Sequence, residues 1–540
     1  MSIQAQLLAK TATALQFQDA AGCMRWIASL PITNVQLAHQ MVSEQVGALT
    51  PAELPALERL KILEALKETV NFAQAEVAKR YLGKPLPLDQ ADAHAWKSVV
   101  GLWGLLGENY QRCLDAYRAG DLPISPFAAL VTLRCLRAAG HSLFEHYQVY
   151  REPGAAAWRA FHQLFAFAEE HGVSRMRVQD VFARHEADSS CAEAYTHGLL
   201  ANLANPYALS VRQMAFLRRW LDKWSSLVSL SAQPLPPGPI PPIAVDFNGD
   251  APAGLAERVA PGASVRYVDL EQIAKTLRQT INLLKQGQTP GKLGLGEDAR
   301  QPGCESLIML LYVQWCRAGT LRTEERHNTT EPAEVCFGIA DSHKLLGGEQ
   351  KAPAAESFSS RDKWEADNLG FSMRMSTTAS QPVIRKSENW QILNHSNSGF
   401  MCMLRDPSGL LRMTHNQLLG LRRGTNTTDT KLGTIQWIKV NETNECQCGI
   451  RLFAGAPKSI SVRPSNFNLP GTQGFEHALL LPEVAMPATP LSVILPAGWF
   501  QAGRMIEIQG EKRQVAKLLN LVERGADFDR GSIAIVDSPS

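Results

Sequence analysis

The first 230 residues place apolar side chains three or four positions apart, which is the spacing of one buried helix face. Proline-containing segments at 85–89 and 121–126 interrupt this pattern, and each also holds an Asp or Ser able to cap the next helix. The pattern therefore predicts an all-helical domain over residues 1–230. The clearest stripe consists of Leu63, Leu66, Val70, Ala73, Val77 and Tyr81.

Beyond residue 319 the pattern changes to short runs with alternating or continuous apolar positions, as strands have. Ala333, Val335, Phe337 and Ile339 form the first run. Residues 345–388 are rich in Ser, Thr, Ala and charge, which indicates a loop inserted after it. The spacing predicts a six-stranded antiparallel β-barrel over residues 319–464. The later runs lie at 390–394, 400–404, 418–422, 432–439 and 449–453.

The remaining segments complete a multidomain α+β chain with a helical N-terminal half, a β-barrel and a further β-rich C-terminal segment. Residues 231–243 are rich in proline and predict an extended linker, followed by a small α/β connecting region over 244–318. Residues 465–540 are expected to form a second small barrel or sheet. Its strand candidates lie at 479–481, 492–495, 505–508 and 532–536.

Composition narrows the class of protein. The chain has 540 residues, enough for several domains, and 54 Lys and Arg nearly balance 52 Asp and Glu, so no global positive field favours DNA binding. Its apolar runs are shorter than the roughly 18 residues of a membrane span, so we expect no membrane insertion. Ten scattered cysteines and a start without a signal-peptide pattern predict a cytoplasmic protein with reduced thiols.

Two short motifs flank the predicted first strand and the insertion. Residues 322–326 read Arg-Thr-Glu-Glu-Arg, with Arg322 first and Arg326 last, and residues 394–399 read Asn-His-Ser-Asn-Ser-Gly. Together they resemble the PilZ family, whose signature is Arg-x-x-x-Arg before a barrel and then Asp or Asn-x-Ser-x-x-Gly after a strand. The resemblance covers about residues 320–463, including the later runs at 432–437 and 448–453.

The resemblance implies a cyclic di-GMP receptor with no catalytic residues and no cofactor. Arg322 and Arg326 would clamp the two bases, because the arginine fork binds guanine N7 and O6, pairs with phosphate and stacks on bases. Asn394, Ser396 and Gly399 would form the wall that contacts the guanine edge. Ligand capture would then change domain arrangement or partner binding, with a protein partner held by the helical half.

Glu324 and Glu325 lie between the two arginines, and we expect them to form local ion pairs that compete with ligand phosphate. One alternative is a PilZ-like scaffold that mediates protein–protein interaction without nucleotide. Another is an enzyme in the helical half, which would need a pocket with convergent polar groups.

No metal site is expected from the sequence. Cys446-Gln447-Cys448 has no second ligand pair at zinc spacing. His185, Cys191 and His197 lie close together in the helical half, but their spacing favours ordinary structural roles.

Overall fold

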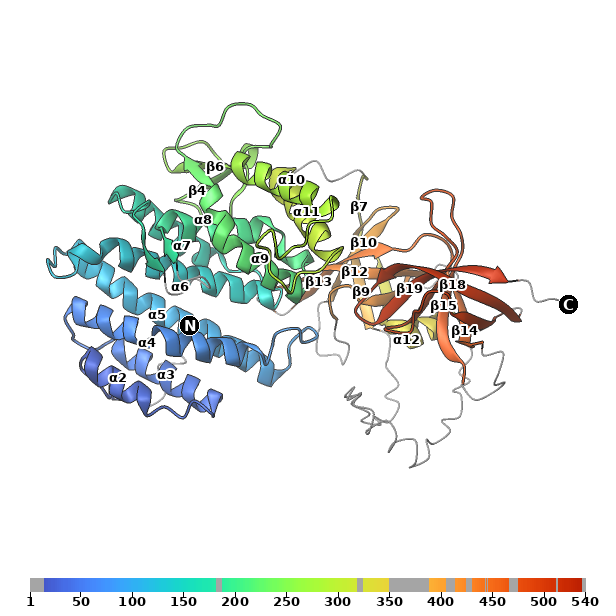
Figure 1. Cartoon of the computed structure of the whole chain (residues 1–540), viewed down its shortest axis with the longest axis horizontal. Helices are drawn as coiled ribbons and strands as arrows, with labels where there is room; N and C mark the ends of the chain where they lie inside the picture. Colours follow the sequence, from blue (N-terminus) through green and yellow to red (C-terminus); the bar gives the residue numbers. More distant parts are fainter. Residues whose placement is uncertain are drawn as a thin grey trace. The chain divides into compact units, whose positions relative to one another are not determined.

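The computed structural model describes residues 14–180, 187–317, 324–348, 388–404, 413–423, 430–441, 443, 445–465, 474–510 and 513–536. The chain divides into two compact units. The first comprises Met1–Thr323 with Lys439–Glu442, and the second Glu324–Ile438 with Thr443–Ser540. The predicted α+β class is confirmed, with helices in the first unit and two β-barrels in the second (Figure 1).

The first unit begins with long helices whose apolar stripes face one another. The predicted stripe lies on α4, where Leu63, Leu66 and Val70 are fully buried, except for Tyr81, which follows the helix. A short hairpin of β1 (Val178–Asp180) and β2 (Ala187–Ser189), absent from the sequence prediction, interrupts the helices. The helices are α2 (Ala20–Ala28), α3 (Val35–Leu49), α4 (Ala56–Ala78), α5 (Gln90–Arg118), α6 (Ala128–Gln148), α7 (Ala155–Glu170), α8 (Cys191–Leu203) and α9 (Val211–Trp224).

Side chains from the connecting segments set where several of these helices begin. The carboxylates of Asp19 and Asp89 accept hydrogen bonds from backbone N–H groups in the first turns of α2 and α5. Ser210 and Gln213 form a reciprocal capping box at the start of α9. Within the described residues, no helix has both the length and the apolar character needed to cross a membrane.

The predicted α/β region belongs to the same unit as the helices. Its sheet has the order β3-β6-β4-β5, and the proline-rich segment connects β3 to β4 inside that sheet. Trp315 on α11 is fully buried, and its indole N–H donates to the carbonyl oxygen of Leu200 on α8 at 3.1 Å. The elements are β3 (Ser229–Ser231), β4 (Ile243–Asp246), β5 (Gly254–Leu255), β6 (Val265–Asp269), α10 (Glu271–Lys285) and α11 (Gly303–Cys316).

The second unit opens with the predicted six-stranded barrel. Its strands close into a ring in the order β8-β9-β10-β13-β12-β11, with β11 pairing back to β8. The short strand β7 lies outside this ring and pairs with β9. The elements are β7 (His327–Asn328), β8 (Pro332–Phe337), α12 (Gly338–Leu345), β9 (Glu388–His395), β10 (Gly399–Leu404), β11 (Leu418–Arg423), β12 (Thr430–Val440) and β13 (Cys446–Leu452).

One part of the sequence prediction for this barrel is wrong. Ile339 was expected to continue the first strand, but the strand ends at Phe337 and Ile339 lies in α12. The chain turns at Gly338, whose φ of +77° is a conformation that glycine adopts without strain. The alternation of apolar residues continued by chance across this turn.

The C-terminal segment forms a second closed barrel in the order β14-β15-β16-β19-β18-β17. Its first strand, β14, falls within the residues that the sequence assigned to the first barrel, yet it pairs with β15 and β17. The strand β18 was not predicted, since charged residues and two register shifts obscure its alternation. The strands are β14 (Lys458–Pro464), β15 (Glu476–Leu481), β16 (Ser492–Pro496), β17 (Met505–Gln509), β18 (Arg513–Arg524) and β19 (Phe528–Val536).

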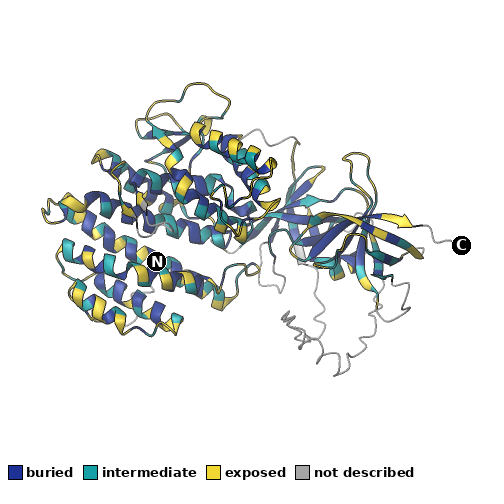
Figure 2. Cartoon of the chain, viewed as in Figure 1, coloured by how far each residue is buried: buried dark blue, intermediate teal, exposed yellow. Residues whose placement is uncertain are grey.

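The two barrels share an apolar core, so they form one folded unit. Helix α12 packs against β11 of the first barrel and β15 of the second. The carboxylate of Asp527 accepts a hydrogen bond from the backbone N–H of Leu418 at 2.9 Å, and burial raises the pKa of Asp527. Buried positions are dark blue in Figure 2. The shared cluster contains Leu418, Leu432, Phe453, Leu479, Leu481, Ile494 and Phe528.

Candidate functional site

Two of the predicted ligand-binding residues, Arg326 and Asn394, meet where β7 pairs with β9. The register of this pairing sets His327 opposite His395 and Asn328 opposite Asn394. Arg326 directly precedes β7, so the pairing brings it to the end of β9. Its Nη1 donates to Asn394 Oδ1 at 2.8 Å across 68 positions of sequence. Arg326 of the first motif and Asn394 of the second are therefore in contact despite the long insertion between them.

The Asn394–Gly399 motif spans the end of β9, the turn at residues 396–398 and the start of β10. The backbone N–H of Ser396 donates to the carbonyl oxygen of Gly399 at 2.9 Å and closes this turn. The carbonyl oxygen of Ser398 accepts from the N–H of Leu452 at 2.8 Å, so the neighbouring strand β13 holds the turn in place. The site thus has a fixed wall, formed by the hairpin.

Gly399 is required by packing rather than by an unusual backbone conformation. A Cβ atom at this position would lie 2.4 Å from the carbonyl oxygen of Ile450, far inside van der Waals contact. That oxygen belongs to β13, which is anchored in the barrel ladder and has little freedom to move. Only glycine fits between the hairpin and β13 without displacing a strand.

We therefore expect Gly399→Ala to destabilise the second unit by about 1–3 kcal/mol, because the added methyl group forces β10 and β13 apart. Urea unfolding of the full chain measures the change in free energy. Gly254→Ala serves as the matched control, since a Cβ atom there meets no other atom within 4 Å. Equal stability of the two variants would contradict the packing argument.

Glu324 also reaches the hairpin. Its Oε2 accepts hydrogen bonds from the backbone N–H of Ser398 at 3.2 Å and from the Ser398 hydroxyl at 2.7 Å. Hydrogen bonds from Ser398 and Ser396 hold the pKa of this carboxyl group below its ordinary value. Glu324 was expected to form a local ion pair that competes with ligand phosphate. In the structure its carboxylate is hydrogen-bonded to Ser398 of the hairpin.

Aromatic and charged side chains extend the wall beside these residues. The imidazole rings of His327 and His395 lie 5.6 Å apart between centroids, and the ring of Phe400 lies 6.3 Å from that of His395. The guanidinium of Arg423 lies 5.7 Å from the Phe400 ring and pairs with Glu331 at 2.7 Å. The site therefore combines π-faces, a guanidinium group and hydrogen-bonding polar groups.

Most of the predicted site residues lie together. Arg326, Asn394, Ser396 and Gly399 form one cluster, while Arg322 lies outside the described residues. Ser398 was missed, because it occupies a variable position of the motif. Its one sequence signal is that it is a small hydroxyl residue within a predicted turn.

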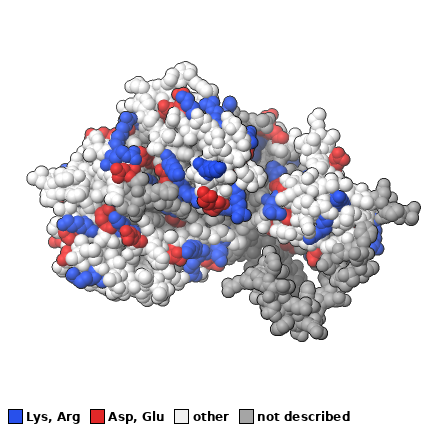
Figure 3. All heavy atoms as spheres, viewed as in Figure 1, with Lys and Arg blue, Asp and Glu red and all other residues white. Residues whose placement is uncertain are grey.

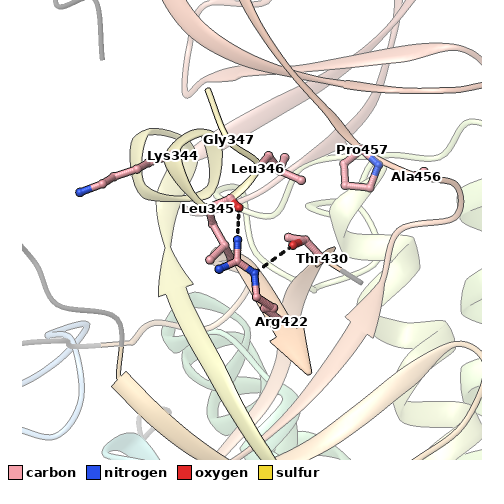
Figure 4. Close-up of a pocket in the computed structure, with 8 residues that line it drawn as sticks. All are labelled: Lys344, Leu345, Leu346, Gly347, Arg422, Thr430, Ala456 and Pro457. Atoms are coloured by element: carbon pink, nitrogen blue, oxygen red, sulfur yellow. Dashed lines mark hydrogen bonds between the residues drawn. The ribbon is translucent and has the colours of Figure 1, made fainter. Parts of the chain in front are cut away.

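A separate pocket lies in the same unit, where α12 ends near β11, β12 and the segment before β14 (Figure 4). Its volume is about 390 Å³, and Lys344 and Arg422 contribute positive charge. Arg422 already donates to Thr430 Oγ1, to the carbonyl oxygen of Leu345 and to Glu334, which commits it to holding the helix end. No residue of the β9–β10 turn lines this pocket.

Cys191 and His197, which the sequence did not favour as metal ligands, have the surroundings of ordinary structural residues in the helical half. The Cys191 thiol donates to the carbonyl oxygen of Ala129, and burial lowers the pKa of His197 to about 3. His185 lies outside the described residues. Among those that are described, no group of three or more His, Cys, Asp or Glu side chains is arranged to hold a metal ion. On the face shown in Figure 3, acidic and basic groups are interspersed.

Comparison with known proteins links both ends of the chain to one family. A family model described as "Cyclic-di-GMP receptor FimW, N-terminal domain" matches residues 20–236, and one described as "FimW C-terminal beta-barrel domain" matches residues 465–534. Together they match more than half of the chain. The chain is also 23% identical to the cyclic-di-GMP receptor FimW of Pseudomonas aeruginosa over 563 aligned positions. That alignment spans 95% of this chain and 91% of the relative.

Proposed function

Because this chain belongs to a family of cyclic-di-GMP receptors, we propose that it binds cyclic di-GMP at the junction of β7 with the β9–β10 hairpin. The observation that carries the proposal is the contact between Arg326 and Asn394, 2.8 Å long, which joins the two halves of the binding motif. Arg322, four positions before Arg326, would supply the second guanidinium group.

Each part of the ligand finds a suitable group in this cluster. Guanine presents N7 and O6 acceptors to which an arginine fork donates two hydrogen bonds, and its face stacks on aromatic or guanidinium planes. Arg326 would exchange its bond with Asn394 for bonds to the ligand. The freed amide oxygen of Asn394 would then accept from a guanine N–H group. Ser396 adds a hydroxyl group next to this amide.

The proposed role is that of a receptor whose response depends on ligand capture. The segment with Arg326 is exposed and precedes a strand of only two residues, so few contacts oppose its rearrangement. Its movement would change the surface around the binding site. A protein partner would dock on the helical half. The cytoplasmic location and the lack of enzymatic activity remain predictions.

The first test is isothermal titration of the full-length protein with cyclic di-GMP, with cyclic di-AMP as the control ligand. Saturable binding of the guanine ligand alone is expected, because adenine offers an amino group where guanine offers O6. Binding of neither ligand at high micromolar concentration would overturn the proposal.

We further expect Asn394→Ala to weaken cyclic di-GMP binding about five- to tenfold, because one base-directed hydrogen bond is lost. Titration of this variant beside the wild type measures the change in Kd. Asn328→Ala is a nearby control, since Asn328 faces Asn394 across the strand pair and is assigned no ligand contact. If Asn328→Ala lost affinity and Asn394→Ala did not, the assignment of Asn394 as a ligand contact would be contradicted.

A further inference from the structure

The contact between Glu324 and Ser398 has the chemistry of an occupied anion site. A single carboxylate oxygen accepts from both the backbone N–H and the hydroxyl group of Ser398. The Ser396 hydroxyl oxygen lies 3.4 Å from that of Ser398, so a second hydroxyl group borders the same point. Two donors of one residue thus converge on one negatively charged oxygen.

The donors at Ser398 restrict what else binds there. A backbone N–H group only donates, so its partner must present an acceptor atom. Hydrogen bonds from N–H and O–H groups are stronger to an ionised acceptor than to a neutral one. A phosphodiester oxygen is such an acceptor, and the distances of 3.2 and 2.7 Å suit it as well as they suit a carboxylate.

Glu324 is tied to the ligand-binding segment by sequence. It lies two positions before Arg326, whose guanidinium group bonds Asn394 at the other end of the same hairpin. Both contacts of this segment therefore occupy groups of the hairpin. A ligand that draws Arg326 away from Asn394 also moves the backbone that holds Glu324 in place.

We propose that the N–H and hydroxyl groups of Ser398 form a subsite for a phosphate oxygen of the cyclic dinucleotide, and that Glu324 occupies it in the free protein. Glu324 is then a resident competitor that leaves when the ligand binds. This inference rests on the proposed function and adds to it a phosphate subsite and a residue that limits affinity. Because Glu324 is exposed, burial does not hold its carboxylate in the subsite.

Glu324→Ala is expected to tighten cyclic di-GMP binding about three- to tenfold, because the ligand no longer displaces an internal anion. Glu325→Ala is the matched control, since it removes the same charge one position away, from an exposed residue. In the Glu324→Ala background, adding Ser398→Ala should weaken binding several-fold, because the subsite hydroxyl group is lost. Titration of the full-length variants gives these ratios.

A second measurement does not depend on the ligand. Hydrogen–deuterium exchange of the free protein should show faster exchange in the peptide containing Ser398 for Glu324→Ala than for the wild type. Faster exchange is expected because the Ser398 N–H loses its acceptor. Glu325→Ala should leave the exchange of this peptide unchanged.

The outcomes separate this inference from the proposed function. If the wild type binds cyclic di-GMP, but Glu324→Ala leaves both affinity and exchange unchanged, only the phosphate subsite is overturned. Equal tightening by Glu324→Ala and Glu325→Ala would also overturn it, because a general charge effect would then suffice. If neither the wild type nor Glu324→Ala binds, the proposed function fails as well.

Discussion

Replacing Arg326 with alanine is expected to lower the affinity for cyclic di-GMP by about 30- to 150-fold, which corresponds to about 2–3 kcal/mol. The Arg326 guanidinium group carries a permanent positive charge and a planar fork suited to guanine. Its loss removes two directed hydrogen bonds and a stacking surface together. Titration calorimetry of the full-length variant measures the change directly.

Arg513→Ala is the control for this loss, since it removes an equally charged and exposed side chain from the second barrel. Its affinity for cyclic di-GMP should stay within about twofold of the wild type, because exposed charges at a distance are screened by salt. The fold of Arg326→Ala should survive, since Arg326 is exposed and its one described hydrogen bond is to Asn394. Unchanged affinity in Arg326→Ala would overturn the assignment of the binding site to the β7 junction with the hairpin, whereas no binding by the wild type would favour the ligand-free scaffold.

Phe528→Ala is expected to destabilise the unit that holds both barrels by about 3–5 kcal/mol. Its ring is fully buried and lies 6.0 Å, centroid to centroid, from that of Phe453. The cluster around it also contains Leu418 and Leu432 from the first barrel. Removing the ring leaves a cavity that borders both barrels, so both barrels lose stability.

Hydrogen–deuterium exchange of the full chain in mild denaturant tests this coupling. Peptides from β11 and β12 of the first barrel should lose protection together with peptides from β15 and β19 of the second. Leu519→Ala, at a position 40% exposed, is the matched control and should change protection little. Loss of protection confined to the second barrel would mean that the two barrels fold independently.

The coupling of the barrels bears on how a binding event is transmitted. The hairpin with Asn394 is held by β13, which is directly followed by Phe453 in the shared cluster. Arg451, opposite Gly399 in the strand register, forms an ion pair with Glu523 of the second barrel. A change at the hairpin therefore has a short physical route to the second barrel.

The sequence alone determined the elements that depend on local pattern. The helical stripe on α4, the main strand runs and the two binding motifs are visible because side-chain periodicity and turn chemistry act over a few residues. The same local rules misplaced Ile339, where a glycine turn ends the strand, and missed β18, where two register shifts break the periodicity.

Only the tertiary structure decided which distant segments meet. The assignment of β14 to the second barrel depends on its pairing with β15 and β17, and pairing partners leave no mark in a single strand's pattern. The contact of Arg326 with Asn394 depends on the β7–β9 register, and that of Glu324 with Ser398 on the turn that follows β9. Local sequence specifies each group, whereas long-range strand pairing specifies its neighbours, and the neighbours give this site its chemistry.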